Sequence, residues 1–240
     1  SLIATRLVTM VQKTFSIDVS IRDVFEYPTI EDFSKYIALM VNRTETPLMQ
    51  EIQFDYDREN ANKPFPLTSV QQAYWIGRSG LYELGNVSTH CYFELDSKAL
   101  DIQRIDKAWN QLVRRHGMMR AVILPTGQQQ ILEKVPDYSI QVNDFSSASV
   151  EEQTSVLETL RGKMSHQVLD VETWPLFDVK VSILSQEDYR IHISFDNLIF
   201  DGWSMFNILN EWAENYHDID KEQLEIPLSF RDYVLGLEKM

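Results

Sequence analysis

The chain has 240 residues, of which 44% are hydrophobic and 24% are charged, a balance typical of a folded globular protein and not of a disordered one. Its 22 basic and 36 acidic residues give a net charge of −14, which argues against nonspecific nucleic-acid binding. A single cysteine excludes an internal disulfide framework, and no segment resembles a signal peptide or a membrane span. We therefore expect a cytoplasmic protein of one or two domains without nucleic-acid or membrane partners.

The first 44 residues carry a helical pattern of apolar side chains. Leu2 and Leu7 belong to one apolar helix face, and Thr29 is a good N-cap for a helix that begins near residue 30. Residues 45–62 are polar and lack sustained periodicity, which is typical of a linker. The sequence thus predicts a small all-α segment over residues 1–44, followed by a linker.

From residue 63 onward, strand patterns alternate with helix patterns. Ser149 with Glu152 forms a capping-box signature for one of the helices. The expected strands cover residues 90–95, 120–124, 129–134, 179–184 and 189–195, and the expected helices cover residues 101–116 and 149–166 and begin again near 203. Helices packed on one antiparallel-rich sheet predict an α+β domain over residues 63–240.

The segment FDNLIFDGWS, residues 195–204, joins the last of these strands to the last helix. Continuing the strand alternation puts Asp196 on the polar face of the sheet. Trp203 and Phe206 recur with later apolar residues at three- and four-residue spacings, so we expect both on the inward side of the helix. Asp196 and Asp201 therefore flank a short loop with a rigid element at each end.

These loop residues resemble the heterocyclization domains of nonribosomal peptide synthetases, which belong to the condensation-domain superfamily. Ordinary condensation domains carry the motif HHxxxDG at this loop. Laid on this sequence, the two histidines fall on Asp196 and Asn197, and the aspartate and glycine fall on Asp201 and Gly202. Heterocyclization domains replace the histidines with the pattern D-x-x-x-x-D, which this chain has together with the family's later serine, Ser204.

Three further segments resemble the same family in the same order. They are FPLTSVQQAYWIGR at residues 65–78, RRHGMMRAV ending at Val122, and TWPLFDVKV at residues 173–181. The resemblance implies a fold like chloramphenicol acetyltransferase, in which two lobes enclose a tunnel that admits a carrier arm from each side. Residues 63–240 correspond to the N-terminal lobe. The aspartate and threonine that the family uses for cyclodehydration lie in the second lobe, so we expect this chain to be inactive by itself.

The first 44 residues resemble the latter part of a peptidyl carrier domain. Ser1 and Leu2 stand where that family has its Ser-Leu dipeptide, and residues 23–37 are similar to its later helices. The resemblance implies that Ser1 carries 4'-phosphopantetheine. It also implies upstream and downstream carrier domains and an adenylation domain as partners, with acyl and aminoacyl thioesters as substrates.

For the two aspartates, structural roles compete with catalytic ones. A carboxylate beside a helix start caps backbone N–H groups or pairs with an arginine, and by analogy with condensation domains we expect Arg120 to be the partner of Asp201. Asp196 is the stronger catalytic candidate because it occupies the place of the first histidine. His192 shares its face, but a structural histidine is the simpler interpretation. No metal-ligand spacing or phosphate-binding glycine loop is present.

The function that the resemblance implies has two steps. A carrier-bound acyl thioester condenses with carrier-bound Cys, Ser or Thr, and the side chain then cyclises with loss of water to a thiazoline or oxazoline, as in siderophore biosynthesis. A plain amide- or ester-forming condensation domain is the first alternative. A noncatalytic docking fragment is the second.

Overall fold

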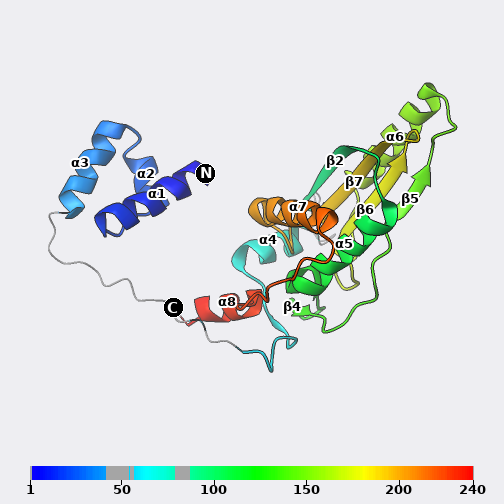
Figure 1. Cartoon of the computed structure of the whole chain (residues 1–240). Helices are drawn as coiled ribbons and strands as arrows, with labels where there is room; N and C mark the ends of the chain where they lie inside the picture. The colour runs from blue at the N-terminus through cyan, green and yellow to red at the C-terminus, as the bar shows by residue number, and fades with distance from the viewer. Residues whose placement is uncertain (1, 42–53, 55–56, 79–86, 240) are drawn as a thin grey trace. The chain divides into compact units, whose positions relative to one another are not determined.

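The computed structural model describes residues 2–41, 54, 57–78 and 87–239 (Figure 1). The chain divides into two compact units, Ser1–Gln53 and Phe54–Met240. None of the described helices is long and apolar enough to cross a membrane. The expected fold class is confirmed, because a helical segment precedes a mixed α+β unit with mainly antiparallel strands.

The described residues of the first unit, 2–41, form three helices around a small apolar core. Val11, Val19 and Phe33 form the centre of that core. The side-chain oxygen of Thr29 accepts a hydrogen bond from the backbone N–H of Asp32 at 3.1 Å, which confirms the expected N-cap. The helices are α1 Leu2–Phe15, α2 Ile21–Glu26 and α3 Ile30–Val41.

The strands in the described part of the second unit form two sheets. The larger one has the strand order β2-β7-β6-β5, and the smaller one has the order β1-β4-β3. Neighbouring strands are antiparallel except β5 and β6, which are parallel. The strands are β1 Phe65–Pro66, β2 His90–Lys98, β3 Ala121–Ile123, β4 Gln128–Ile131, β5 Gln141–Asp144, β6 Phe177–Ile183 and β7 Asp188–Asp196. The parallel strand β5 is not predicted by the sequence pattern, since it is mostly exposed and carries little alternation.

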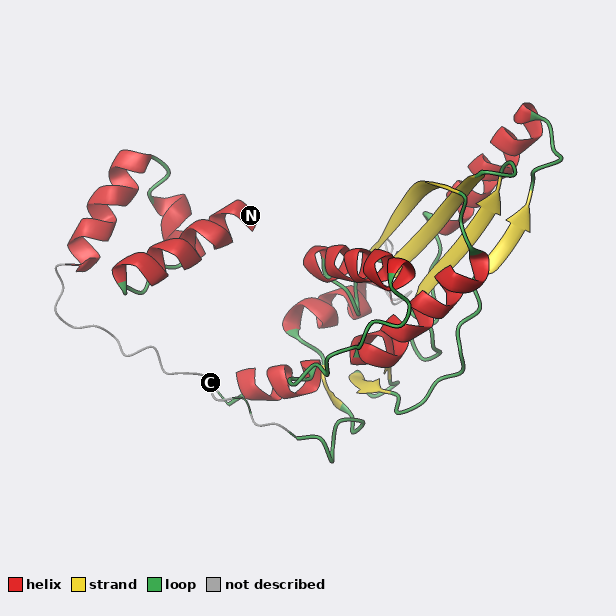
Figure 2. Cartoon of the chain, viewed as in Figure 1, coloured by secondary structure: helices red, strands yellow, loops and turns green. Residues whose placement is uncertain are grey.

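Helices cover both faces of the larger sheet (Figure 2). On one face, the Trp109 ring of α5 lies 5.2 Å from Phe177 of β6 and 4.7 Å from Trp212 of α7, measured between ring centroids. On the other face, Arg161 of α6 donates two hydrogen bonds to Glu94 of β2, at 2.7 and 2.8 Å. The helices are α4 Ser69–Arg78, α5 Ile102–Arg115, α6 Val150–Met164, α7 Gly202–His217 and α8 Phe230–Leu237, with a 3₁₀ turn η1 at Gly117–Arg120.

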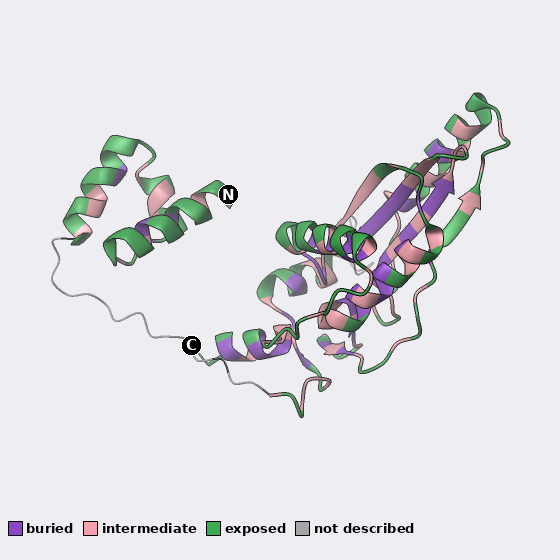
Figure 3. Ribbon diagram, in the orientation of Figure 1, coloured by how far each residue is buried: buried purple, intermediate pink, exposed green. Residues whose placement is uncertain are grey.

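The central strands β6 and β7 are the most deeply buried part of the unit (Figure 3). Phe177, Ile193 and Phe195 are at most 1% exposed and belong to the largest apolar cluster. Burying a large apolar side chain of this kind contributes about 1.5–3 kcal/mol to folding. The end of β7 is therefore a rigid support for whatever follows it.

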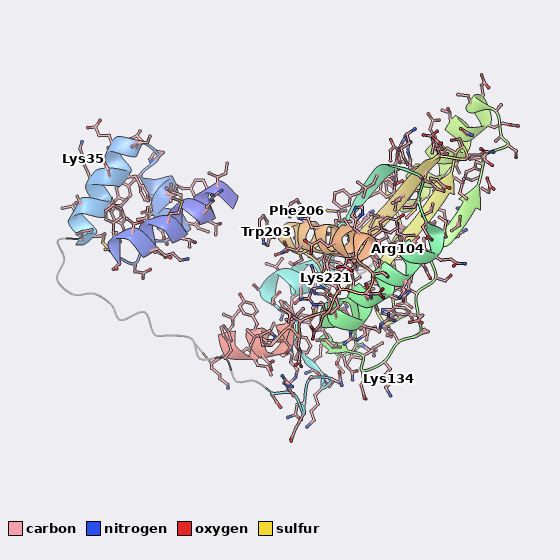
Figure 4. The ribbon with its side chains drawn as sticks, viewed as in Figure 1. Lys35, Arg104, Lys134, Trp203, Phe206 and Lys221 are labelled. Carbon is pink, nitrogen blue, oxygen red and sulfur yellow. The ribbon has the colours of Figure 1, made fainter. Side chains whose placement is uncertain are left out.

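Two side chains of α7 do not follow the expected pattern. Trp203 and Phe206 are 59% and 55% exposed, and their rings stack with centroids 5.7 Å apart at the N-terminal end of the helix (Figure 4). The expectation that both face inward is wrong. The buried face of α7 is narrower than the periodicity predicts, and its apolar residues are Met205, Ile208 and Trp212.

Helix α8, which the sequence pattern did not predict, packs against residues near the start of the unit. Arg231 Nη1 lies 3.3 Å from Asp57 Oδ2. Gly236 faces the Phe54 ring so closely that a Cβ at position 236 would lie 2.5 Å from Phe54 Cδ1. A glycine is needed here because the aromatic ring occupies the space of a side chain.

The predicted linker is therefore too long at its C-terminal end. Gln130 of β4 donates a hydrogen bond to the carbonyl of Asn62 at 2.9 Å, so residues 57–62 pack on the second unit at both ends of this stretch. Residues 45–53, 55 and 56 of the predicted linker lie outside the described residues.

A buried polar chain lies on the α6 side of the larger sheet. His192 is 0% exposed, with Nε2 3.0 Å from Ser182 Oγ and Nδ1 2.8 Å from Tyr92 Oη. Tyr92 donates in turn to Glu94 at 2.9 Å. A neutral imidazole satisfies this chain if Nδ1 carries the proton. Burial lowers the pKa of His192 from 6.5 to about 4, so His192 has the structural role that the sequence favoured.

This buried histidine predicts a loss of stability in mild acid. Between pH 6.5 and pH 4 the unfolded chain binds a proton at His192 that the folded chain excludes, so the free energy of unfolding falls as the pH drops through this window. The full effect is at most about 3 kcal/mol. We expect His192→Gln to have a shallower decline than the wild-type chain in urea unfolding at pH 7, 6 and 5. His217→Gln, at an exposed position, is the control and should keep the wild-type slope; an equal slope in His192→Gln would contradict the assignment.

Candidate functional site

The loop between β7 and α7 is organised by the last residue of the strand. The backbone carbonyl of Asp196 accepts hydrogen bonds from the N–H groups of Ile199 and Phe200, at 3.1 and 3.2 Å. Its Oδ1 accepts from the N–H of Leu198 at 2.9 Å. Asp196 thus folds the chain back on itself through both its backbone and its side chain.

The side chain of Asp196 is also paired with a cation. The carboxylate is 1% exposed and its Oδ2 accepts from Arg78 Nη2 at the end of α4 and from Ser88 Oγ at 3.1 Å. Arg78 also donates to Ser88 Oγ at 2.6 Å and to the carbonyl of Leu169 at 3.1 Å. Both carboxylate oxygens therefore accept hydrogen bonds. The sequence predicts Asp196 on the polar face of the sheet, and the structure shows it as the buried partner of an ion pair.

Arg78 belongs to the family-like segment at residues 65–78, but the sequence analysis assigns it no role. Its charge could have drawn attention to it, because Arg78 is the one charged residue in the sequence of α4, SVQQAYWIGR. A cation at the end of such a helix needs an anion nearby when it is buried. The sequence does not show which anion this is, because Asp196 lies 118 positions away in the chain.

Asp201 has a local role at the start of α7. Its Oδ1 accepts a hydrogen bond from the backbone N–H of Ser204 at 2.7 Å, which makes Asp201 the N-cap of the helix. Partial burial alone would raise the pKa of Asp201, but hydrogen bonds from Ser204 and from the first turn outweigh it and lower the pKa below its usual value. Asp201 is therefore held as a carboxylate.

The expected ion pair between Asp201 and Arg120 is not formed. Arg120 instead donates to backbone carbonyls at the end of α5 and after β4, which are Val113 at 2.5 Å, Arg114 at 2.7 Å and Leu132 at 3.1 Å. The helix C-terminus offers unpaired carbonyl groups that favour a cation. Each of the two side chains is thus satisfied by a nearby helix end.

A cavity of about 1490 Å³ lies against the loop within the second unit. Its lining includes the loop residues 197–201, Ser204 and Asn207 of α7, and Tyr74 of α4. Sites for small ligands usually measure roughly 300–1,000 Å³, so this cavity has room for an extended ligand. Asn197 stands on the wall where the ordinary family motif has its second histidine, and an amide provides no useful base.

Ser1, the residue expected to carry 4'-phosphopantetheine, lies outside the described residues.

The Arg78–Asp196 pair predicts a large cost for removing one partner. We expect Asp196→Asn to lower the free energy of unfolding by about 3–5 kcal/mol, because Arg78 would remain buried without its anion. Denaturant unfolding of the purified chain measures this cost. Asp188→Asn, which breaks the exposed pair with Lys98, is the matched control and should leave the unfolding midpoint nearly unchanged. Similar costs for both variants would contradict the importance of the buried pair.

The cap at Asp201 predicts a different ranking of variants. Asp201→Ala should cost about 1 kcal/mol of stability through loss of the cap, whereas Asp201→Asn should retain most of it because asparagine also caps helices. The same unfolding experiment separates the two. Equal losses from Asn and Ala would show that the charge of Asp201 matters more than its hydrogen bond.

Two family models match the chain. The model described as Condensation domain matches residues 61–240, and the model described as Phosphopantetheine attachment site matches residues 1–37. The second match indicates a covalently attached 4'-phosphopantetheine.

Individual proteins agree with these matches. Bacitracin synthase 1 of Bacillus licheniformis is 30% identical over 98% of this chain and 4% of its own length. Phenyloxazoline synthase MbtB of Mycobacterium sp. (strain MCS) is 28% identical over 90% of this chain and 18% of its own length. The chain thus spans a small part of these curated relatives.

Among solved structures, the EpoB NRPS cyclization-docking bidomain from Sorangium cellulosum is similar, with a TM-score of 0.74 and 33% identity over 87% of this chain and 40% of that one. The loop between β7 and α7 lies inside the matched range of the condensation model. With three quarters of its residues in that range, the chain belongs to the condensation-domain family of nonribosomal peptide synthetases and carries part of a phosphopantetheine-bearing carrier domain before it.

Proposed function

We propose that residues 63–240 form the N-terminal lobe of a heterocyclization domain. In this proposal the complete domain condenses a carrier-bound acyl or peptidyl thioester with carrier-bound Cys, Ser or Thr. It then closes the side chain onto the new amide carbonyl with loss of water, giving a thiazoline or oxazoline. The lobe in this chain supplies one wall of the site, and by itself we expect it to be inactive.

The observation that carries the proposal is the construction of the loop from Asp196 to Asp201. Where ordinary condensation domains have paired histidines, this chain has a buried aspartate, paired with Arg78, and an asparagine. The loop therefore offers no imidazole to the cavity. It is built as a fixed surface, and this supports a reaction in which the alignment of two bound substrates does most of the work.

Alignment of this kind is sufficient for a large part of the first step. Holding a thioester and an amine in reacting geometry gives effective molarities of roughly 10⁵–10⁸ M, whereas a general base contributes roughly 10²–10⁴-fold. We assign to Asp196 the ordering of the loop. We assign to Asp201, which caps α7 and lines the cavity as a carboxylate, the electrostatic environment of the reacting groups.

The carrier part fits the same scheme. We propose that residues 1–44 are the latter part of a carrier domain, with Ser1 as the attachment point of 4'-phosphopantetheine. The bound arm would hold the acyl group as a thioester and deliver it to a neighbouring site. An adenylation domain and the carriers on either side are the expected partners, and residues 45–53 belong to the connecting linker.

The printed names of similar proteins support heterocyclization over plain condensation. One solved relative is described as a cyclization-docking bidomain, and one sequence relative is described as a phenyloxazoline synthase. Those activities belong to those proteins. The general condensation model matches residues 61–240 and is equally compatible with the plain amide-forming alternative.

Intact mass spectrometry of the acceptor arm tests the proposal. The sample is the synthetase region that contains this sequence and both lobes, supplied with a loaded acyl carrier and a cysteinyl acceptor carrier. We expect a product that has lost one water beyond amide formation. The same region without the second lobe is the control and should give no product.

A stable uncyclised amide would assign the domain to plain condensation. No acyl transfer between properly loaded carriers would favour the noncatalytic docking alternative. Either result would overturn heterocyclization.

A further inference from the structure

A buried pair of glutamine side chains connects α4 to β4 beside the loop. Gln71 and Gln129 are 6% and 0% exposed, and each donates a hydrogen bond to the side-chain oxygen of the other at 2.9 Å. The second N–H of Gln129 donates a hydrogen bond to the carbonyl of Pro66 at 2.9 Å. We call Gln71 and Gln129 the amide pair. A reciprocal pair of this kind fixes both side chains in one orientation.

The second N–H of Gln71 reaches the loop itself. It donates to the backbone carbonyl of Leu198 at 2.7 Å, in the middle of the segment between Asp196 and Asp201. The oxygen of Gln71 accepts from Thr68 through both its backbone N–H at 3.0 Å and its hydroxyl at 3.1 Å. The oxygen and both N–H groups of the Gln71 amide therefore have partners. A flipped amide would lose these hydrogen bonds, so the side chain has one favoured orientation.

Few contacts from other elements reach the interior of this loop. Arg78 and Ser88 bind Asp196, which precedes the interior, and the N–H of Asn197 donates to the carbonyl of Thr89 at 2.9 Å. Within the described residues, Gln71 is the side chain from another element that hydrogen-bonds to residues 197–200. Gln71 also lines the cavity, next to the carbonyl that it holds.

We propose that Gln71 is a positioning residue that sets the conformation of loop 197–200 against the cavity and thereby the rate of acyl transfer. The claim that Gln71 sets the loop conformation depends on the hydrogen bonds alone. The claim that it affects the rate of acyl transfer rests on the proposed condensation function. Gln71 touches no reacting atom in this scheme and acts through the position of the loop.

Two isosteric variants separate loop positioning from general stability. Gln71→Glu replaces the N–H group that faces the Leu198 carbonyl with an oxygen, so attraction becomes repulsion. Gln129→Glu is the matched control, because it disturbs the same buried amide pair and the bond to Pro66 but leaves the bond between Gln71 and Leu198 in place. Gln71→Asn and Gln129→Asn form a second pair for use if a carboxylate at either position prevents folding.

Hydrogen–deuterium exchange of the 240-residue chain gives the first readout. In Gln71→Glu we expect the amides of residues 197–200 to exchange about fivefold faster than in the wild-type chain, the factor expected for loss of one hydrogen bond. In Gln129→Glu these amides should exchange at a rate close to wild type, with the increase confined to β1 and β4. Equal increases at residues 197–200 in both variants would overturn the proposal.

Acyl-transfer kinetics of the synthetase region with both lobes give the second readout. We expect Gln71→Glu to lower kcat by roughly ten- to a hundredfold with KM for the acceptor carrier nearly unchanged, and Gln129→Glu to lower it much less. If the amides of residues 197–200 exchange faster in Gln71→Glu but kcat is unchanged, the loop conformation does not set the rate of acyl transfer, and that part of the proposal is overturned. A wild-type enzyme that forms no amide would overturn the proposed function instead, while the exchange experiment would still decide whether Gln71 positions the loop.

Discussion

The buried ion pair between Arg78 and Asp196 is the interaction on which the rest of the site depends. It joins α4 to the end of β7, and the two charged groups also hydrogen-bond to Ser88 Oγ, the carbonyl of Leu169 and the N–H of Leu198. A buried pair is tolerated only when nearly all of its hydrogen-bonding groups are satisfied, since desolvation of two ions costs several kcal/mol each. The loop can therefore keep one conformation at the place where the strand leaves the sheet.

The elements that the sequence predicted well are those whose signals are local. The alternation before Asp196 gave the strand, the Ser149 capping box gave the start of α6, and the D-x-x-x-x-D pattern gave the location of the loop. The ion pair and the amide pair were not predicted, because Arg78 and Gln71 meet their partners only after the chain has folded. Their partners Asp196 and Gln129 lie 118 and 58 positions away.

The wrong expectations have two physical reasons. Asp201 and Arg120 were paired by charge, but a helix end beside each of them provides N–H or carbonyl groups at lower entropic cost. Trp203 and Phe206 were placed inward by periodicity, which gives the direction of a helix face and not its width. The sequence thus locates the loop, but it assigns some of the residues around the loop the wrong neighbours.

The contact between Phe54 and Gly236 has a mechanical consequence. The aromatic ring fills the space of a side chain at position 236, so the beginning of the second unit is pressed against its last described helix, and Asp57 adds an ion pair to Arg231 beside it. A pull on the chain ahead of residue 54 would have to break these contacts with α8 before it reached β1 at Phe65.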